Sequence, residues 1–391
     1  MAPTDSNSFP LVEFNAISGM SNAWLALGLR VEPVHGDLAS GLHQVFSSPD
    51  LLAAIAPLDC VVMLDSPDVL SESLLALMPA NRVRFCIGSG ALGHDIDRRR
   101  LVAMHEAGHR VLVDGPLAEN VIAPPALRTV ANDFSRNVGH KNILPLGFGP
   151  HLAYGVYDAE RLGHCGRIGY EWFAGEYPLH PQPSARPDDG SSRKRLMTLL
   201  GLLARDAETR ELETLLKQDP SLSYQLLKLA NSAAFAHSAH ISSFGQAISI
   251  LGRRQLQRWL QLLLYARQQP DGMSNPLLPV AALRAAQMEA LCKQRGGERQ
   301  EQDTAFMTGV FSLLDVLFAM PMQQIVGALN LAPIAADALL LREGPLGELL
   351  RLAEARRVTP NLLENAGFTP AAWWQTQLHA YHWAITVSRN L

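Results

Sequence analysis

Hydrophobic and polar positions follow two different patterns along the chain, and the first pattern covers residues 20 to 180. Short runs rich in β-branched and aromatic residues, bounded by Gly, Pro and Asp, predict strands. Helical spacing occurs between several of them, at Leu70–Leu77 and Asp97–Ala107. Continuous apolar strands separated by helices predict a parallel sheet covered on both faces, either as a barrel or as an open doubly wound sheet. The predicted strands are Trp24–Val31, Cys60–Leu64, Val83–Ile87, Arg110–Val113 and Ile143–Leu146.

The second pattern begins at Arg195 and has helical spacing with no convincing strand. Asp219 and Pro220 supply an N-cap followed by a proline in the first turn. Gly252 is placed to end the helix that precedes it. Prolines near the starts of several later segments are typical of helix beginnings, and this half is predicted to be all-α. Further helices are predicted at 254–267, 280–294, 303–319, 322–330, 334–342, 346–357 and 370–387.

A segment without hydrophobic periodicity separates the two patterns. Residues 181–194 are rich in Pro, Ser and charged residues, which is typical of a linker. We therefore predict an α/β domain over 1–180 and an all-α domain over 195–391. The length of 391 residues is compatible with two or three domains.

The charge balance narrows the classes of partner. Charged residues make up only 18% of the chain and the net charge is −4, so the basic excess of a nucleic-acid-binding protein is missing. So little charge indicates that much apolar surface is buried within the chain or against a partner. The first residues do not resemble a signal peptide, and no uninterrupted apolar run reaches the ~18 residues of a membrane span. A cytoplasmic protein is therefore expected.

One short motif suggests metal chemistry. The segment His105-Glu-Ala-Gly-His109 matches H-E-x-x-H, in which two histidines on one helix face bind zinc and the glutamate acts as a base. Gly108, however, is placed to end the helix, and a strand is predicted directly after His109. His109 would then lie outside the helix that carries His105. A zinc metalloprotease built on His105, Glu106 and His109 is kept only as an alternative.

The second half carries a set of residues with specific mutual spacing, within Leu212–Ala234 and Ile241–Gly252. This set resembles the HDOD domain, and the similarity extends from 195 to 390. HDOD domains are similar to HD-type phosphohydrolases without their His-Asp metal site, so the resemblance implies a helical bundle without metal or cofactor. Because caps and core leucines also explain these residues, they predict the fold more than a binding site. The residues are Asp219, Pro220, Leu226, Leu227, Asn231, Ser232 and Gly252.

The first half resembles EAL domains, the barrels of cyclic di-GMP phosphodiesterases. Gly169–Pro178 is similar to the closing segment of that family, and His109–Pro116 resembles its strand that ends in paired aspartates. In one bacterial signalling family an HDOD domain follows an EAL domain. Because residues 1–180 are fewer than the about 250 of a full eight-unit barrel, a shortened, degenerate TIM-barrel-like fold is predicted.

Departures from the EAL pattern determine the predicted function. Of the paired aspartates only Asp114 remains, the family's lysine position is occupied by Ala131, and the first strand, Leu25–Arg30, lacks its acid. A single carboxylate cannot hold two metal ions. We therefore predict a protein that is not an enzyme, has no metal or cofactor, and keeps Asp114 as a vestige of the family's site.

The expected role is regulatory. The resemblance implies a bacterial protein that acts through protein–protein interaction in signalling linked to cyclic di-GMP or to two-component systems. The sequence does not identify the partners, and it leaves a homodimer open. The alternative is that the first domain binds cyclic di-GMP as a sensor, or keeps phosphodiesterase activity. Arg30 and Arg128 are candidates for phosphate contacts, but arginines of this kind are too generic to single out.

Overall fold

The chain forms two compact units in the computed structural model. Unit 1 consists of Met1–Gln182 together with Arg357–Leu378, and unit 2 of Pro183–Arg356 together with His379–Leu391. A segment from late in the sequence therefore packs with the N-terminal unit. The structure describes residues 9–33, 36–117, 121, 123–136, 149–181, 191–205, 207–217, 224, 246, 252–266 and 273–390.

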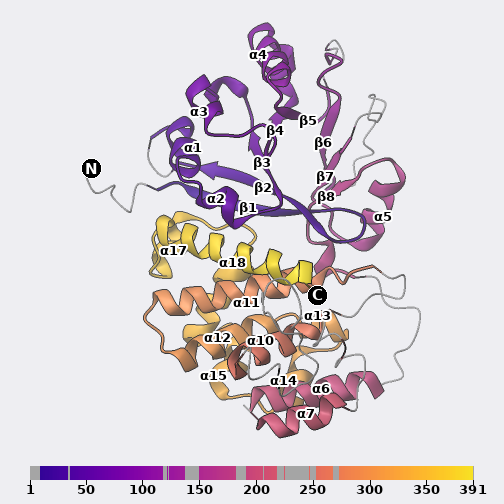
Figure 1. The fold of residues 1–391 in the computed structure, drawn as a ribbon, viewed down its shortest axis with the longest axis vertical. Helices are drawn as coiled ribbons and strands as arrows, with labels where there is room; N and C mark the ends of the chain where they lie inside the picture. The colour runs from indigo at the N-terminus through magenta and orange to yellow at the C-terminus, as the bar shows by residue number, and fades with distance from the viewer. Residues whose placement is uncertain are drawn as a thin grey trace. The chain divides into compact units, whose positions relative to one another are not determined.

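Unit 1 is built on a closed barrel of eight strands, in which each strand neighbours the next along the chain and β8 returns to β1 (Figure 1). β1 runs antiparallel to both β2 and β8, whereas all other neighbours are parallel. Closure leaves no open sheet edge. The strands are β1 (Leu11–Ser18), β2 (Trp24–Glu32), β3 (Asp59–Leu64), β4 (Val83–Gly88), β5 (Arg110–Asp114), β6 (Thr129–Asp133), β7 (Leu152–Tyr154) and β8 (Trp172–Phe173).

The closed barrel corrects the predicted fold class. The predicted shortened barrel was wrong, because all eight strands are present and the sheet closes. The predicted parallel sheet was also wrong for β1, which is antiparallel to its neighbours. The chain saves length in its connections and in its strands: a tight turn with Asn22 at a φ of 64° joins β1 to β2, and β8 has only two residues.

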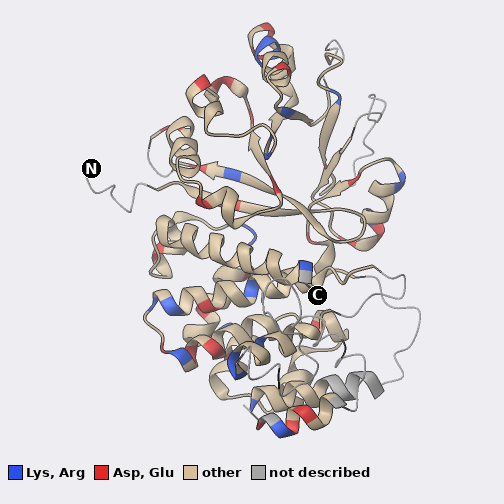
Figure 2. Ribbon diagram, viewed as in Figure 1, with Lys and Arg blue, Asp and Glu red and all other residues tan. Residues whose placement is uncertain are grey.

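The helices of unit 1 lie outside the barrel (Figure 1). Side-chain caps define several of their starts: Asp37 accepts from the Ser40 N–H at 2.7 Å, and Ser71 from the Leu74 N–H at 3.2 Å. Figure 2 shows both acidic and basic residues on α4 (Asp95–Glu106), the longest of these helices, which fits a face in contact with water. The other helices are α1 (Leu38–Phe46), α2 (Asp50–Ala54), α3 (Glu72–Ala76) and α5 (Ala159–Arg167), with short 3₁₀ turns at Pro67–Val69, Ser89–Gly93 and Tyr177–Leu179.

Side chains fill the inside of the barrel. One inward-pointing residue from each strand, together with Ala174, joins a buried cluster, so side chains pack the barrel as a core. Trp172 fills one end, where the guanidinium of Arg84 lies 4.9 Å from its ring centre. The cluster consists of Ile17, Ala26, Val61, Cys86, Leu112, Ala131, Leu152, Trp172 and Ala174.

In unit 2, every element assigned among the described residues is a helix. α11 (Leu277–Gln294) and α12 (Arg299–Phe311) approach each other closely at Gly309, where a Cβ would lie only 2.7 Å from the Cα of Ala285. α18 (Pro370–Asn390) is divided between the two units, and α17 (Pro360–Asn365) belongs to unit 1. The others are α6 (Ser191–Ala204), α7 (Thr209–Lys217), α10 (Arg253–Leu263), α13 (Leu314–Phe318), α14 (Met322–Leu329), α15 (Pro333–Leu341) and α16 (Gly344–Glu354).

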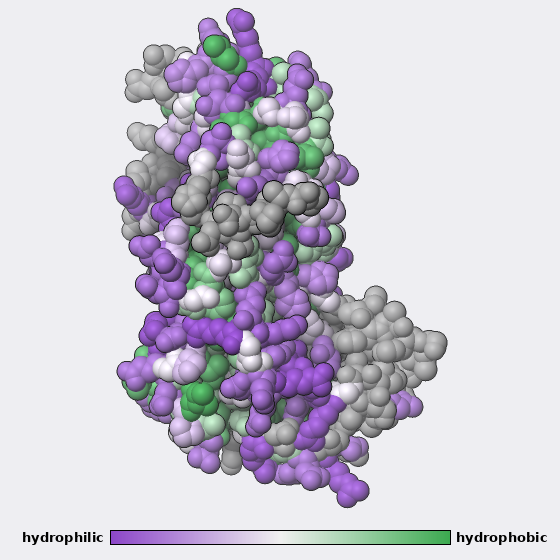
Figure 3. Space-filling view, turned by 90° about the vertical axis from the view of Figure 1, so that its left-hand side faces the viewer, coloured by the Kyte–Doolittle hydropathy of each residue, from purple (hydrophilic) through white to green (hydrophobic). Residues whose placement is uncertain are grey.

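Large apolar side chains at the surface are scattered over both units. Ile96 and Leu341 are among the most exposed of them. On the face drawn in Figure 3, hydrophobic residues lie between hydrophilic ones in each unit. Among the described residues, no helix is long and apolar enough to cross a membrane.

Candidate functional site

The carboxyl ends of the parallel strands form one mouth of the barrel, and a cavity of about 260 Å³ opens there. This is the end where barrels of this kind place their functional residues. This volume lies just below the about 300–1,000 Å³ that is usual for a ligand pocket. Its polar lining comes from the middle of β1, the end of β2 and the end of β7, namely Asn15, Arg30 and Tyr154, together with the backbones of Gly28, Gly155 and Gly175.

Asp114 ends β5 beside this cavity. The Tyr154 hydroxyl donates to its carboxylate, 2.9 Å from Oδ1 and 3.1 Å from Oδ2. Burial raises the pKa of Asp114, and the nearby carboxylates of Asp133 and Asp65 raise it further, whereas Tyr154 and Arg30 act in the opposite direction. Burial also raises the pKa of Tyr154 far above its usual value, with Asp114 as the next cause. The tyrosine therefore stays protonated and remains a donor to the carboxylate.

The strand register shows which residues stand beside Asp114. Its direct neighbours are Gly88 on β4 and Ala131 on β6. A Cβ at Gly88 would lie 2.8 Å from the carbonyl oxygen of Asp65, so this position leaves no room for a side chain. Ala131 occupies the position that the family resemblance assigns to a lysine. Among the described residues, no three His, Cys, Asp or Glu side chains converge as a group that could hold a metal ion.

Arg30 provides the positive charge at the mouth. It is exposed, lines the cavity, and has no ion-pair or hydrogen-bond partner among the described residues. Arg128, the other candidate arginine, is exposed and precedes the first residue of β6. It therefore stands at the opposite end of the barrel. The structure thus separates two arginines that the sequence could not rank.

The H-E-x-x-H segment does not present two histidines on one helix face. α4 ends at Glu106, and Gly108 has a φ of 95°. The Gly108 N–H donates to the His105 carbonyl and the His109 N–H to the Met104 carbonyl, which together form a Schellman ending. His109 is only 7% exposed and its ring packs edge-on against Phe85. Burial lowers the pKa of His109, so it stays neutral in the core.

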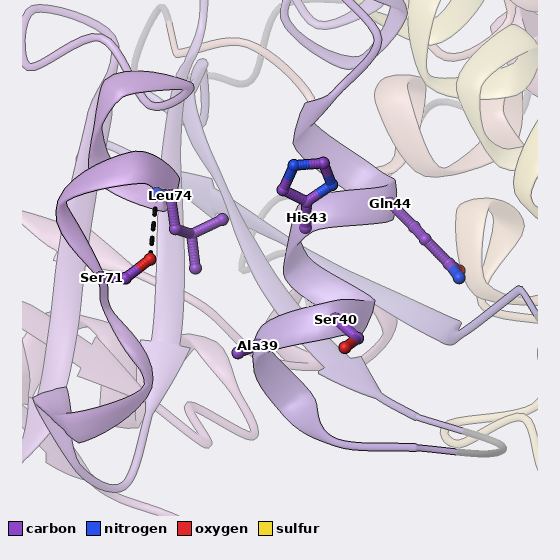
Figure 4. A pocket seen from close by; sticks show the side chains of 6 residues that line it. All are labelled: Ala39, Ser40, His43, Gln44, Ser71 and Leu74. Atoms are coloured by element: carbon purple, nitrogen blue, oxygen red, sulfur yellow. Dashed lines mark hydrogen bonds between the residues drawn. The ribbon is translucent and has the colours of Figure 1, made fainter.

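A second hollow lies between α1 and α3 (Figure 4). It has a volume of about 400 Å³ and is lined by Ala39, Ser40, His43, Gln44, Ser71 and Leu74. Ser71 is already used as the cap of α3, and Figure 4 shows Gln44 directed away from His43. None of the described residues that line this hollow carries a carboxylate or guanidinium group. The barrel mouth, which has both, is the stronger candidate.

Most of the predicted HDOD signature lies outside the described residues: Asp219, Pro220, Leu226, Leu227, Asn231 and Ser232, as does the predicted strand Ile143–Leu146. Gly252 is described. It has a φ of 76° and directly precedes α10. A positive φ at this position favours glycine over any residue with a side chain.

A family model matches part of the second half of the chain. Residues 193–319 match the family model of the HDOD domain. This part of the chain is an HDOD domain. It covers α6, α7 and α10–α13 among the described helices, together with the segment that carries the signature residues. Every element assigned to the described part of this domain is a helix.

Two curated relatives share part of the chain. The cyclic di-GMP phosphodiesterase CdgJ of Vibrio cholerae is 33% identical over 186 residues, which cover 45% of this chain and 42% of CdgJ. The uncharacterized protein YuxH of Bacillus subtilis is 27% identical over 189 residues, covering 48% of this chain and 46% of YuxH. The matched part is thus less than half the length of each relative.

Among solved structures, the YkuI protein of Bacillus subtilis has an EAL domain and was solved with cyclic di-GMP and calcium. It is 13% identical, with 62% of this chain and 71% of YkuI covered, and the TM-score is 0.33. A similarity at that level does not establish a shared fold.

Proposed function

We propose that this protein is a non-catalytic regulator in cyclic di-GMP-linked signalling, with an EAL-related barrel followed by an HDOD domain, and that it acts by binding a signalling protein. The HDOD match and the similarity to CdgJ support the signalling role. The resemblance of Gly169–Pro178 and His109–Pro116 to EAL segments supports the origin of the barrel.

The observation that carries the non-catalytic part is the row of residues around Asp114. Hydrolysis through two metal ions needs several converging carboxylates. At this row the carboxylate stands between Gly88 and Ala131 and accepts the Tyr154 hydroxyl on both oxygens. The carboxylates of Asp65 and Asp133 lie near enough to raise the pKa of Asp114, but among the described residues no three His, Cys, Asp or Glu side chains converge as a group that could hold a metal ion. The row therefore offers one hydrogen-bonded carboxylate where a phosphodiesterase needs a set of free ligands.

We expect the full chain to release no linear dinucleotide from cyclic di-GMP in the presence of Mg²⁺ or Mn²⁺, as measured by liquid chromatography. The matched control is Asp114→Asn, which keeps the side-chain size and should give the same trace as the wild type. Linear product that the wild type forms and Asp114→Asn does not would contradict the proposal and favour a residual phosphodiesterase.

A second candidate function is binding of cyclic di-GMP at the mouth without hydrolysis. It is favoured by one observation: Arg30 is exposed, lines the cavity and has no partner among the described residues. A guanidinium in this state can form two parallel hydrogen bonds with a phosphate. Such contacts need no metal ligands, so they are compatible with the row of residues around Asp114.

Titration calorimetry with cyclic di-GMP tests this second candidate. Arg30→Ala is expected to weaken binding by about tenfold or more, because a charge-assisted hydrogen bond contributes about 1.5–3 kcal/mol. Arg128→Ala, at the other end of the barrel, is the matched control and should bind like the wild type. Equal losses in the two variants, or no heat from the wild type, would refute binding through Arg30.

A further inference from the structure

Arg30 has a natural counter-ion that it does not use. In the β1–β2 ladder Glu13 stands directly opposite Arg30, and Glu32 lies two residues further along β2 on the same side as Arg30. Opposite charges at directly paired positions of an antiparallel ladder normally attract each other. Glu13 and Glu32 are therefore positioned to pair with Arg30 and to compete with any anion for its guanidinium.

Both glutamates face another arginine instead. Arg357 forms an ion pair with Glu32, and its Nε lies 3.7 Å from Glu13 Oε1. Burial raises the pKa of Glu13 and repulsion from Glu32 raises it further, whereas Arg357 and then Arg30 lower it. Arg357 is thus the cation with the larger effect on Glu13, even though Arg30 is its ladder partner.

The polypeptide that follows Arg357 packs on β1 and on the residues before it. Arg357 is the first residue of the late segment that belongs to unit 1. Within that segment the ring of Trp374 stacks on Phe14 of β1, with 5.7 Å between ring centres and 15° between planes, and it also contacts Phe9. Thr359 caps α17 through the Leu362 N–H at 3.2 Å. The segment that follows Arg357 in the sequence therefore keeps this residue beside the β1–β2 hairpin.

We propose that Arg357 is a positioning residue for the barrel mouth: it holds Glu13 and Glu32 and so leaves Arg30 available to an anionic ligand. This inference rests on the second candidate function for the identity of the ligand, but the arrangement of charges stands on the hairpin geometry alone. With two arginines and two glutamates the group is balanced. Without Arg357, two carboxylates flank one guanidinium, and among the described residues Arg30 is the cation that remains beside them.

The first test measures Arg30 directly, without a ligand. Phenylglyoxal modifies free guanidinium groups, and the rate at Arg30 can be followed by peptide mass spectrometry on the full chain. Arg357→Ala is expected to slow modification of Arg30 by about fivefold, the upper end for an exposed ion pair. Modification of Arg128 in the same samples is the internal control and should not change. An unchanged rate at Arg30 would overturn the proposal.

A rescue separates positioning from a merely structural role. Adding Glu13→Gln and Glu32→Gln to Arg357→Ala should restore the rate at Arg30, because the competing carboxylates are gone. In the wild-type background the same two substitutions should leave the rate unchanged, since Arg30 is already free. A faster rate in that double variant would show that Arg30 was paired with the glutamates, and it would overturn the proposal whether or not Arg357→Ala folds.

The ligand arm uses cyclic di-GMP on the same variants. Arg357→Ala should weaken binding by about fivefold, and the two glutamine substitutions should restore it. If the wild type gives no binding while the phenylglyoxal rates follow the expected order, the second candidate function fails and the positioning role of Arg357 stands. If cyclic di-GMP binds but Arg357→Ala leaves both the affinity and the Arg30 rate unchanged, the positioning role fails alone.

Discussion

Glu354→Ala is expected to lower the free energy of unfolding of unit 2 by about 3–5 kcal/mol, because it leaves two arginines without their shared counter-ion. Arg342 donates to both oxygens of Glu354, from Nε at 2.8 Å and from Nη2 at 3.0 Å. Arg284 donates from Nη1 to Glu354 Oε1 at 3.2 Å and to Ser312 Oγ at 2.9 Å. The side chain of Arg284 is only 10% exposed, and burial lowers its pKa while Glu354 raises it.

The burial of Arg284 and the partial burial of Glu354 and Arg342 make the effect large. Glu354 is 23% exposed, so its charge is shielded from water much more than that of a surface pair. Glu348 on the same helix is the matched control: its carboxylate pairs with Arg295 at 3.1 Å but is half-exposed. Glu348→Ala should cost about 0–1 kcal/mol. Urea unfolding of the full chain, followed by far-ultraviolet circular dichroism, measures both variants. Equal costs would show that the Glu354 cluster contributes no more than a surface pair.

The sequence predicted the helices of unit 2 where short-range signals determine them. α14 and α15 begin at Met322 and Pro333, within one residue of the predicted starts, because Pro321 directly precedes α14 and Pro333 is the first residue of α15. The predicted helix at 303–319 is two helices, since the chain turns at Ser312 and Leu313 between α12 and α13. That turn depends on packing, including the Ser312 hydroxyl that accepts from Arg284, and no local pattern indicates it.

The barrel was harder to predict because several of its strands are very short. β2 to β5 match the predicted strands, but β1, β6, β7 and β8 were missed. β7 has three residues and β8 has two, too few for any period to be visible. Their place in the sheet is set by neighbours that are distant in the sequence. Closure of the barrel is therefore a tertiary property that strand patterns alone do not contain.

In the candidate site, too, some residues could be identified from the sequence, whereas those that depend on contacts between distant parts of the chain could not. The resemblance of His109–Pro116 to an EAL segment pointed to Asp114, and the sequence named Arg30 without a means to rank it. It missed Tyr154, which reaches Asp114 from 40 positions away along the chain. It also missed Arg357, which is 325 positions from Glu32. The first contact becomes visible only when β5 and β7 are placed in the same barrel, and the second only when the late segment is seen to pack with unit 1.

Trp172→Ala is expected to lower the free energy of unfolding of unit 1 by about 3–5 kcal/mol, the usual cost of removing a buried tryptophan. Trp172 is 6% exposed and fills the barrel at the end opposite the mouth. Its ring also lies under the guanidinium of Arg84, which is held by Asp59 at 2.8 Å. Truncation removes the ring, leaves a cavity, and exposes Arg84 and Asp59 to an apolar void.

Two further variants show whether the lost ring and its cavity, or the disturbed Arg84–Asp59 pair, accounts for most of the loss in stability. Trp172→Phe keeps an aromatic ring over Arg84 and most of the volume, so it should cost well under half as much as Trp172→Ala. Asp59→Asn keeps the packing but removes the charge that holds Arg84, and should cost about 1 kcal/mol. Urea-dependent pulse proteolysis of the full chain, with fragments assigned by mass spectrometry, measures the loss in unit 1. If Trp172→Ala cost no more than Asp59→Asn, the ring would not be the plug of the barrel. The buried neighbours of the indole in this cluster include small side chains such as Ala26, Ala131 and Ala174, which cannot fill the space that the indole leaves.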